Sequence, residues 1–183
     1  MPWPSLLILY FRDERKKPCL QHLKRFLSYL LQQAKACAEY FSTTKFAGIY
    51  CSDLKRANST AKAIYAAQAE PKPLFEVSPE LREQHFGIAE GQPWTIHNDG
   101  GMDIANKIFP VPVGRAEKFP EGESLDDLAE RAGRIIKEFI MPWINDTGKT
   151  WGKKEGNVHI AIVSHGLCIY EVRVALIFPH PIF

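Results

Sequence analysis

The sequence lacks the residue groupings that bind metals or build disulfide networks. Its four cysteines are Cys19, Cys37, Cys51 and Cys168, with no C-x-x-C pair among them and no cluster of histidines anywhere in the chain. A zinc site and a disulfide-rich scaffold are therefore both disfavoured. We expect no metal and no cofactor, and the scattered cysteines favour a reducing, cytoplasmic location.

An excess of one charge and a long apolar run are also missing. The 23 Lys and Arg residues nearly balance the 21 Asp and Glu residues, leaving a net charge of +2. This balance gives no reason to expect a nucleic acid or a membrane as partner. The apolar residues 6–11 have no basic residue before them and precede the charged residues 12–17. They are too short to cross a bilayer, so we interpret them as a core strand and not as a signal peptide.

Strand-like and helix-like stretches alternate along the chain. Its 183 residues suit a single domain, 1–183, and no internal repeat is present. Apolar runs predict strands at 6–11, 46–51, 74–77 and 160–163, and helical spacing predicts helices at 20–42, 53–68, 124–140 and 167–178. This alternation predicts an α/β fold with a largely parallel sheet and helices on both faces.

Capping residues and a proline set the expected helix ends. Ser52 or Asp53 can cap the helix after the second strand, and Ser124 with Asp127 forms a capping box. Pro142 is expected to end the helix that starts at this box.

Between residues 81 and 123, glycines and prolines interrupt every periodic pattern. This composition predicts a long connection with at most one short helix, and connections of this length are often functional. Its Lys107, Arg115 and Lys118 could face an acidic substrate, but solvated surface charge is the role we expect for them.

Two basic residues follow the ends of predicted strands. His165 lies at the turn after strand 160–163, where open α/β sheets bind anions beside the free amides of the next helix. Arg56 lies in the first turn of the helix after strand 46–51, so its guanidinium can fold back and grip an oxyanion. Considered alone, His165 could be a turn histidine that has only a structural role, and Arg56 could be a solvated surface arginine.

Glu83 follows strand 74–77 and is a candidate general acid. A carboxyl group held at a strand end beside a phosphate pocket can protonate a leaving oxygen. Its alternative is a surface glutamate in a turn. We assign the neighbouring His85 and Glu90 to surface turns.

Four motifs taken together resemble the histidine phosphatase superfamily. They are Tyr-Cys-Ser-Asp-Leu-Lys-Arg-Ala-x-x-Thr-Ala at 50–61, Leu-Arg-Glu-x-x-Phe-Gly-x-x-Glu-Gly at 81–91, Pro-Glu-Gly-Glu-Ser-Leu at 120–125 and Val-Ser-His-Gly at 163–166. The chain is most similar to the phosphoglycerate-mutase-like branch, which includes fructose-2,6-bisphosphatase and TIGAR-like enzymes. The resemblance implies a three-layer α/β/α sandwich with a mostly parallel sheet. It also implies metal-independent phosphoryl transfer on a small phosphorylated substrate, a sugar phosphate or a phosphoglycerate.

The resemblance assigns roles to the three candidates. Arg56 matches the second phosphate-binding arginine, Glu83 the general acid, and His165 the second histidine, which helps to hold the phosphoryl group. In the family, an Arg-His-Gly motif after the first strand supplies another arginine and the nucleophilic histidine.

No Arg-His-Gly occurs in this sequence, and Arg12-Asp13-Glu14 stands at the equivalent place. Arg12 then becomes the first phosphate-binding arginine, and Asp13 replaces the nucleophile. A negative charge at about 4 Å from a phosphate, with an effective dielectric near 20, costs on the order of 4 kcal/mol per unit charge. We therefore do not expect Asp13 to act as a nucleophile.

Three hypotheses remain open from the sequence. The first is a phosphatase or mutase of this family, impaired here because the nucleophilic histidine is missing. The second is a binding module without turnover that recognises phosphorylated sugars or acids through Arg56 and His165. The third is a truncated or misspliced product, because the chain stops at Phe183 without the family's usual final strand.

Overall fold

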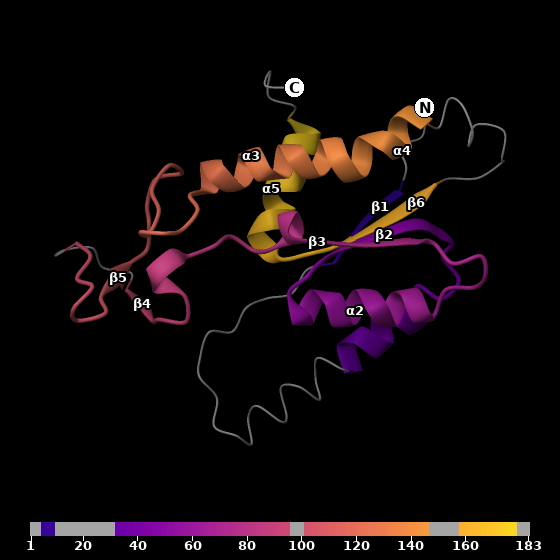
Figure 1. Ribbon diagram of the computed structural model, residues 1–183, viewed down its shortest axis with the longest axis horizontal. Helices are drawn as coiled ribbons and strands as arrows, with labels where there is room; N and C mark the ends of the chain where they lie inside the picture. Colours follow the sequence, from indigo (N-terminus) through magenta and orange to yellow (C-terminus); the bar gives the residue numbers. More distant parts are fainter. Residues whose placement is uncertain (1–4, 10–31, 96–100, 147–157, 179–183) are drawn as a thin grey trace.

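A four-stranded parallel sheet forms the centre of the structure (Figure 1). The computed structural model describes residues 5–9, 32–95, 101–146 and 158–178. The strands are β1 (Ser5–Leu9), β2 (Phe46–Ser52), β3 (Leu74–Ser78) and β6 (His159–Val163), in the order β1-β6-β2-β3. All three pairings are parallel, which confirms the predicted sheet. The carboxyl ends of the four strands therefore meet at one edge.

Helices cover both faces of this sheet (Figure 1). One face carries α2 (Lys55–Ala66) and a helix over residues 32–40, and the other carries α3 (Leu125–Ile135), α4 (Met141–Asp146) and α5 (Gly166–Ile177). The predicted three-layer α/β/α arrangement is confirmed. The part of the predicted first helix before residue 32 lies outside the described residues. Among the described ranges, no helix is long and apolar enough to cross a membrane.

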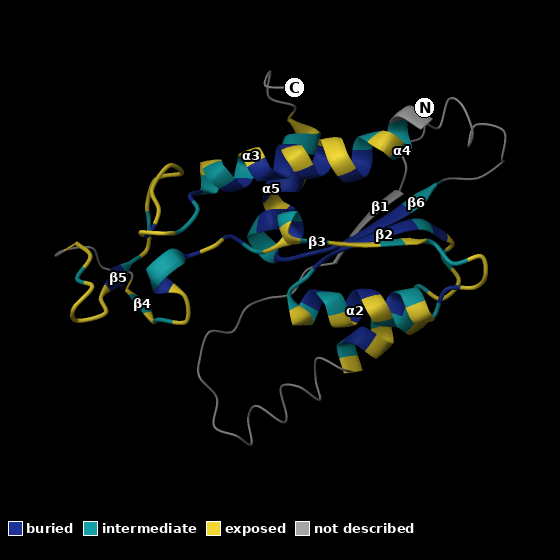
Figure 2. Cartoon of the chain, in the orientation of Figure 1, coloured by how far each residue is buried: buried dark blue, intermediate teal, exposed yellow. Residues whose placement is uncertain are grey.

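The core lies on both faces of the sheet because successive strand residues point to opposite sides. Tyr50, Ile160 and Ile162 pack against α3 and α5, whereas Ile49 and Val163 pack against α2. Figure 2 shows the central strands as the most buried part of the chain. Burying one such side chain contributes about 1.5–3 kcal/mol. The apolar runs of the sequence thus form a well-packed sheet, and polar residues can be held in fixed positions at its carboxyl edge.

Pro142 does not end the helix, contrary to the prediction. α3 continues into a π-helical turn, η3 (Ile136–Ile140), and then into α4, whose second residue is Pro142. The amide of Met141 donates to the Ile136 carbonyl, and this wider turn precedes the residue that has no N–H. Trp143 then packs over Gly48, where a Cβ would lie 3.0 Å from the indole ring.

One of the two predicted helix caps is present. Ser124 Oγ accepts from the Asp127 amide at 3.0 Å, and the Asp127 carboxylate accepts from the Ser124 amide at 2.9 Å, which confirms the capping box. The prediction for α2 is wrong, because Leu54 is its N-cap residue and makes no side-chain cap. Ser52 Oγ instead accepts from the Leu54 amide at 3.2 Å, one step before the helix begins.

The connection between residues 81 and 123 has more structure than predicted. It contains η2 (Gly87–Ala89), β4 (Trp94–Thr95) and β5 (Phe109–Pro110), and η1 (Pro79–Leu81) leads into it. The two short strands pair in parallel. Arg115 is more than a solvated charge, because its guanidinium lies 2.9 Å from the carboxylate of Glu171, which is 2% exposed. Lys118 pairs at the surface with Asp127 at 2.7 Å.

Candidate active site

A pocket of about 580 Å³ opens at the carboxyl edge of the sheet. Arg56 contributes from the first turn of α2, Glu83 from the segment after β3, and Arg134 from α3. Three elements that follow or cover the strand ends thus converge on one cavity. Two of the sequence-predicted site residues, Arg56 and Glu83, lie on its wall.

His165 lies behind Arg56 and is fully buried. The Nε of Arg56 donates to His165 Nδ1 at 3.0 Å, and His165 Nε2 lies 3.0 Å from Ser52 Oγ. An arginine Nε–H can only donate, so Nδ1 must be the unprotonated ring nitrogen. Nε2 therefore carries the proton and donates to Ser52. The predicted fold-back of Arg56 toward the strand ends is confirmed.

The imidazole of His165 is held in its neutral form. Burial, together with the nearby charges of Arg56 and Arg131, lowers the pKa of His165 to about 4. A neutral ring next to a guanidinium acts as a hydrogen-bond acceptor that sets the orientation of that guanidinium. In this geometry, Arg56 is the member of the pair that faces the pocket.

The carboxylate of Glu83 lies on the first turn of α5. Its Oε1 accepts from the amides of Leu167 at 3.1 Å and Cys168 at 3.2 Å, and from the amide of Gln84 at 3.2 Å. A carboxylate is favoured there by the orphan amides and by the helix dipole. The expectation that this helix offers free amides to a bound anion is therefore corrected, because Glu83 already accepts from two of them.

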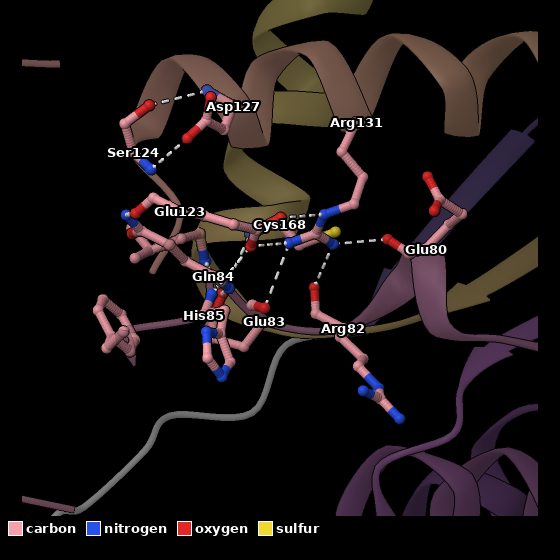
Figure 3. Close-up of polar contacts among 12 residues, drawn as sticks. Glu80, Arg82, Glu83, Gln84, His85, Glu123, Ser124, Asp127, Arg131 and Cys168 are labelled. Carbon is pink, nitrogen blue, oxygen red and sulfur yellow. Dashed lines mark hydrogen bonds and ion pairs between the residues drawn. The ribbon is translucent and has the colours of Figure 1, made fainter. Parts of the chain in front are cut away.

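Arg131 is a site residue that the sequence patterns did not reveal. It extends from α3 to the segment after β3 and is 5% exposed (Figure 3). Its guanidinium pairs with both carboxylate oxygens of Glu123, at 3.0 and 2.7 Å. Although burial opposes the shift, the hydrogen bonds from Arg131 and from the His85 amide hold the pKa of Glu123 below its usual value. One signal was available, since Arg131 falls on the apolar stripe of α3.

The rim of the pocket carries a second ion pair. Arg82 Nε donates to Asp53 Oδ1 at 2.7 Å, and its hydrogen bonds lower the pKa of Asp53. His85 and Glu90, which were assigned to surface turns, also line the pocket. The amide of His85 donates to Glu123 at 2.9 Å, so this part of the wall is tied to the Arg131 network.

The arrangement combines an oriented cation with a nearby carboxyl group. Arg56 can bind an oxyanion through a guanidinium whose orientation His165 sets, and Glu83 can exchange a proton in the same pocket. Within the described residues, no group of His, Cys, Asp and Glu side chains has the arrangement of a metal site. Arg12 and Asp13 lie outside the described residues, so their assignments stay predictions.

The fold and the pocket define an α/β protein with a polar, arginine-containing cavity at the carboxyl edge of a parallel sheet. A family model described as the histidine phosphatase superfamily (branch 1) matches residues 31–177, and the chain belongs to this superfamily. The matched region includes Arg56, Glu83 and His165.

Several known proteins are similar to this chain. The chain is 31% identical over 120 residues to a probable fructose-2,6-bisphosphatase TIGAR A of Danio rerio, covering 63% of this chain and 43% of that protein. It is 28% identical over 146 residues to a 2,3-bisphosphoglycerate-dependent phosphoglycerate mutase 2 of Gloeobacter violaceus, covering 79% and 60%. A solved mycobacterial glucosyl-3-phosphoglycerate phosphatase superposes with a TM-score of 0.59 at 26% identity, covering 82% of this chain and 67% of that one. The chain spans about half the length of the curated relatives it matches.

Proposed function

We propose that this chain carries a phosphatase-type site for a small phosphorylated metabolite, a sugar phosphate or a phosphoglycerate. The observation that carries the proposal is the position of Arg56, whose guanidinium is oriented by buried His165 on the wall of a pocket that also contains Glu83. Related proteins named for bisphosphatase, mutase and sugar-phosphate phosphatase activities support the same substrate class.

The proposed roles follow from the chemistry of each group. Arg56, with Arg12 by family resemblance, holds the phosphoryl group, and its guanidinium charge offsets the charge of the phosphate oxygens. His165, which the sequence assigned to phosphate binding, serves here as the buried acceptor that orients Arg56. As the nucleophile at the position of the first motif forms its bond to phosphorus, the ester P–O bond breaks and the proton of the Glu83 carboxyl group goes to the leaving oxygen. The two α5 amides that bind Glu83 then stabilise the carboxylate that this transfer leaves behind.

The first motif impairs turnover in this proposal. In the family an imidazole attacks phosphorus as a neutral nitrogen, whereas this chain has Asp13 at that place. A carboxylate repels the incoming phosphate dianion. The same observation favours a second candidate function, a module that binds phosphate esters without turning them over.

Phosphate binding tests the site itself. Inorganic phosphate or glucose 6-phosphate should raise the melting temperature of the chain, because a ligand at 100 times its Kd stabilises the folded state by about 2.7 kcal/mol. Arg56→Ala should abolish this shift. Lys55→Ala is the matched control, because Lys55 is an exposed neighbour in the same turn of α2 and should leave the shift unchanged. The absence of any shift in the unmodified chain would contradict both candidate functions.

Hydrolysis of p-nitrophenyl phosphate separates the two candidates. We expect little or no turnover by the unmodified chain and only partial recovery in the double variant Asp13→His, Glu14→Gly, because the family resemblance implies a longer loop at this place than residues 12–33 provide. Recovery that depends on Glu83 would favour an impaired phosphatase, and bound phosphate without recovery would favour the binding module. Full turnover by the unmodified chain that disappears in His165→Ala would show that the first motif does not limit activity.

A further inference from the structure

We infer that Arg131 is a positioning residue that holds the backbone after β3 so that the carboxyl group of Glu83 reaches the first turn of α5. The inference rests on the proposed function insofar as Glu83 is the proton donor. Arg131 itself lies on α3 and acts on the reacting group only through the backbone that carries Glu83.

Every N–H of the Arg131 guanidinium has an acceptor. Nη1 donates to the carbonyls of Glu80 at 2.6 Å and Arg82 at 2.7 Å. Nη2 donates to the Glu83 carbonyl at 3.2 Å, and the remaining two donors go to the Glu123 carboxylate. An arginine has five N–H donors in a planar fork, so the group is saturated. In Figure 3, the Arg131 guanidinium lies between Glu80, Arg82, Glu83 and Glu123.

The hydrogen bonds from Arg131 to the carbonyls of Glu80, Arg82 and Glu83, which we call the Arg131 clamp, fix the direction of the Glu83 side chain. Its carbonyl is held by Arg131 from α3, and its carboxylate is held by the amides of Leu167 and Cys168 from α5. The residue is therefore attached to two helices by its two polar ends. If the carbonyl end is released, the backbone turns and the carboxylate leaves the amides.

Glu123 pairs with the charge of Arg131, so the Arg131 clamp binds the backbone carbonyls and not the Glu83 carboxylate. A buried guanidinium without a carboxylate partner would draw the nearest acidic side chain, and Glu83 belongs to the same segment. Because Glu123 occupies Nε and one Nη2 donor, the positive charge is neutralised on the side of α3. Glu83 remains available to α5 and to the pocket.

Amide resonances test the inference without any need for turnover. In ¹H–¹⁵N spectra of the full chain, Glu83→Gln identifies how the Leu167 and Cys168 amides respond when the charged acceptor is lost. We expect Arg131→Met to move these two resonances in the same direction as Glu83→Gln. Arg131→Lys, which keeps the charge and the fold more easily, should give an intermediate displacement, because an ammonium group cannot reach three carbonyls in a fixed plane.

The control is Arg173→Met, which removes an exposed arginine from α5 and should leave both resonances at their wild-type positions. Phosphate titration of the unmodified chain keeps the two proposals separate. Its failure to bind phosphate would contradict the proposed function, while the Leu167 and Cys168 resonances of the variants would still report on Arg131. Unchanged Leu167 and Cys168 resonances in folded Arg131→Met or Arg131→Lys would overturn the inference.

Discussion

Replacing Gly87 with alanine should destabilise the folded chain by about 2–5 kcal/mol, the sum of a left-handed backbone penalty and an overpacking penalty. Gly87 has a φ of +53°, and a Cβ at this position would lie 1.9 Å from the Pro120 carbonyl oxygen. The collision is with backbone and cannot be relieved by a rotamer change. It would separate two segments that are joined by hydrogen bonds from Ile88 to Pro120 and from Glu123 to His85.

Urea unfolding measures this loss, and Gly91→Ala is its control. Gly91 also has a positive φ, +68°, but no atom of the described residues lies within 4 Å of the position that a Cβ would take there. Gly91→Ala should therefore show the backbone penalty alone, about 1–2 kcal/mol. Equal losses in the two variants would contradict the overpacking penalty. They would mean that the backbone at Pro120 moves away from the added Cβ without a measurable loss of stability.

The folded chain should lose about 3 kcal/mol of stability as the pH falls from 7 to 4, because of His165 alone. The folded-state pKa of His165 is lowered to about 4, against an ordinary value of 6.5. The unfolded chain therefore takes up a proton as the pH falls below 6.5, while the folded chain does so only near 4. The stabilisation is complete above the unfolded pKa and is lost progressively through this window.

Unfolding curves recorded at several pH values between 7 and 4 check this slope. His165→Asn removes the titrating ring, so the stability of this variant should fall by about 3 kcal/mol less over the same range. The amide oxygen that the variant introduces can take the place of Nδ1 as the acceptor for Arg56, so phosphate binding should be largely kept. An unchanged pH slope in His165→Asn would show that the ring does not titrate between the two states as its burial requires.

Local sequence patterns were sufficient for the layers of the fold and for part of the site. Short apolar runs produce the buried strands β2 and β6, and the Ser124–Asp127 pattern produces the cap of α3. Arg56 and Glu83 could be predicted because each follows a strand within a recognisable motif. Their meeting in one pocket follows from the parallel order of those strands.

Features that depend on distant partners could not be predicted in this way. Arg131 binds carbonyls about fifty positions earlier in the chain, and no pattern in the sequence around Arg131 indicates these partners. Pro142 was expected to end a helix because the π-helical turn before it has no sequence signature. The occupation of the α5 amides by Glu83 is likewise a product of tertiary packing.

The span of these contacts has a consequence for how the site comes into being during folding. Arg56 and His165 are 109 positions apart, and Glu83 is 84 positions from Leu167. Contacts across such separations require the closure of long loops, and topologies rich in them fold slowly. The local helices can form before the pocket, which needs β6 and α5 in place. During synthesis, the oriented arginine and the anchored carboxylate therefore arise together and late, and a nascent chain has no site until residue 168 has been added and docked.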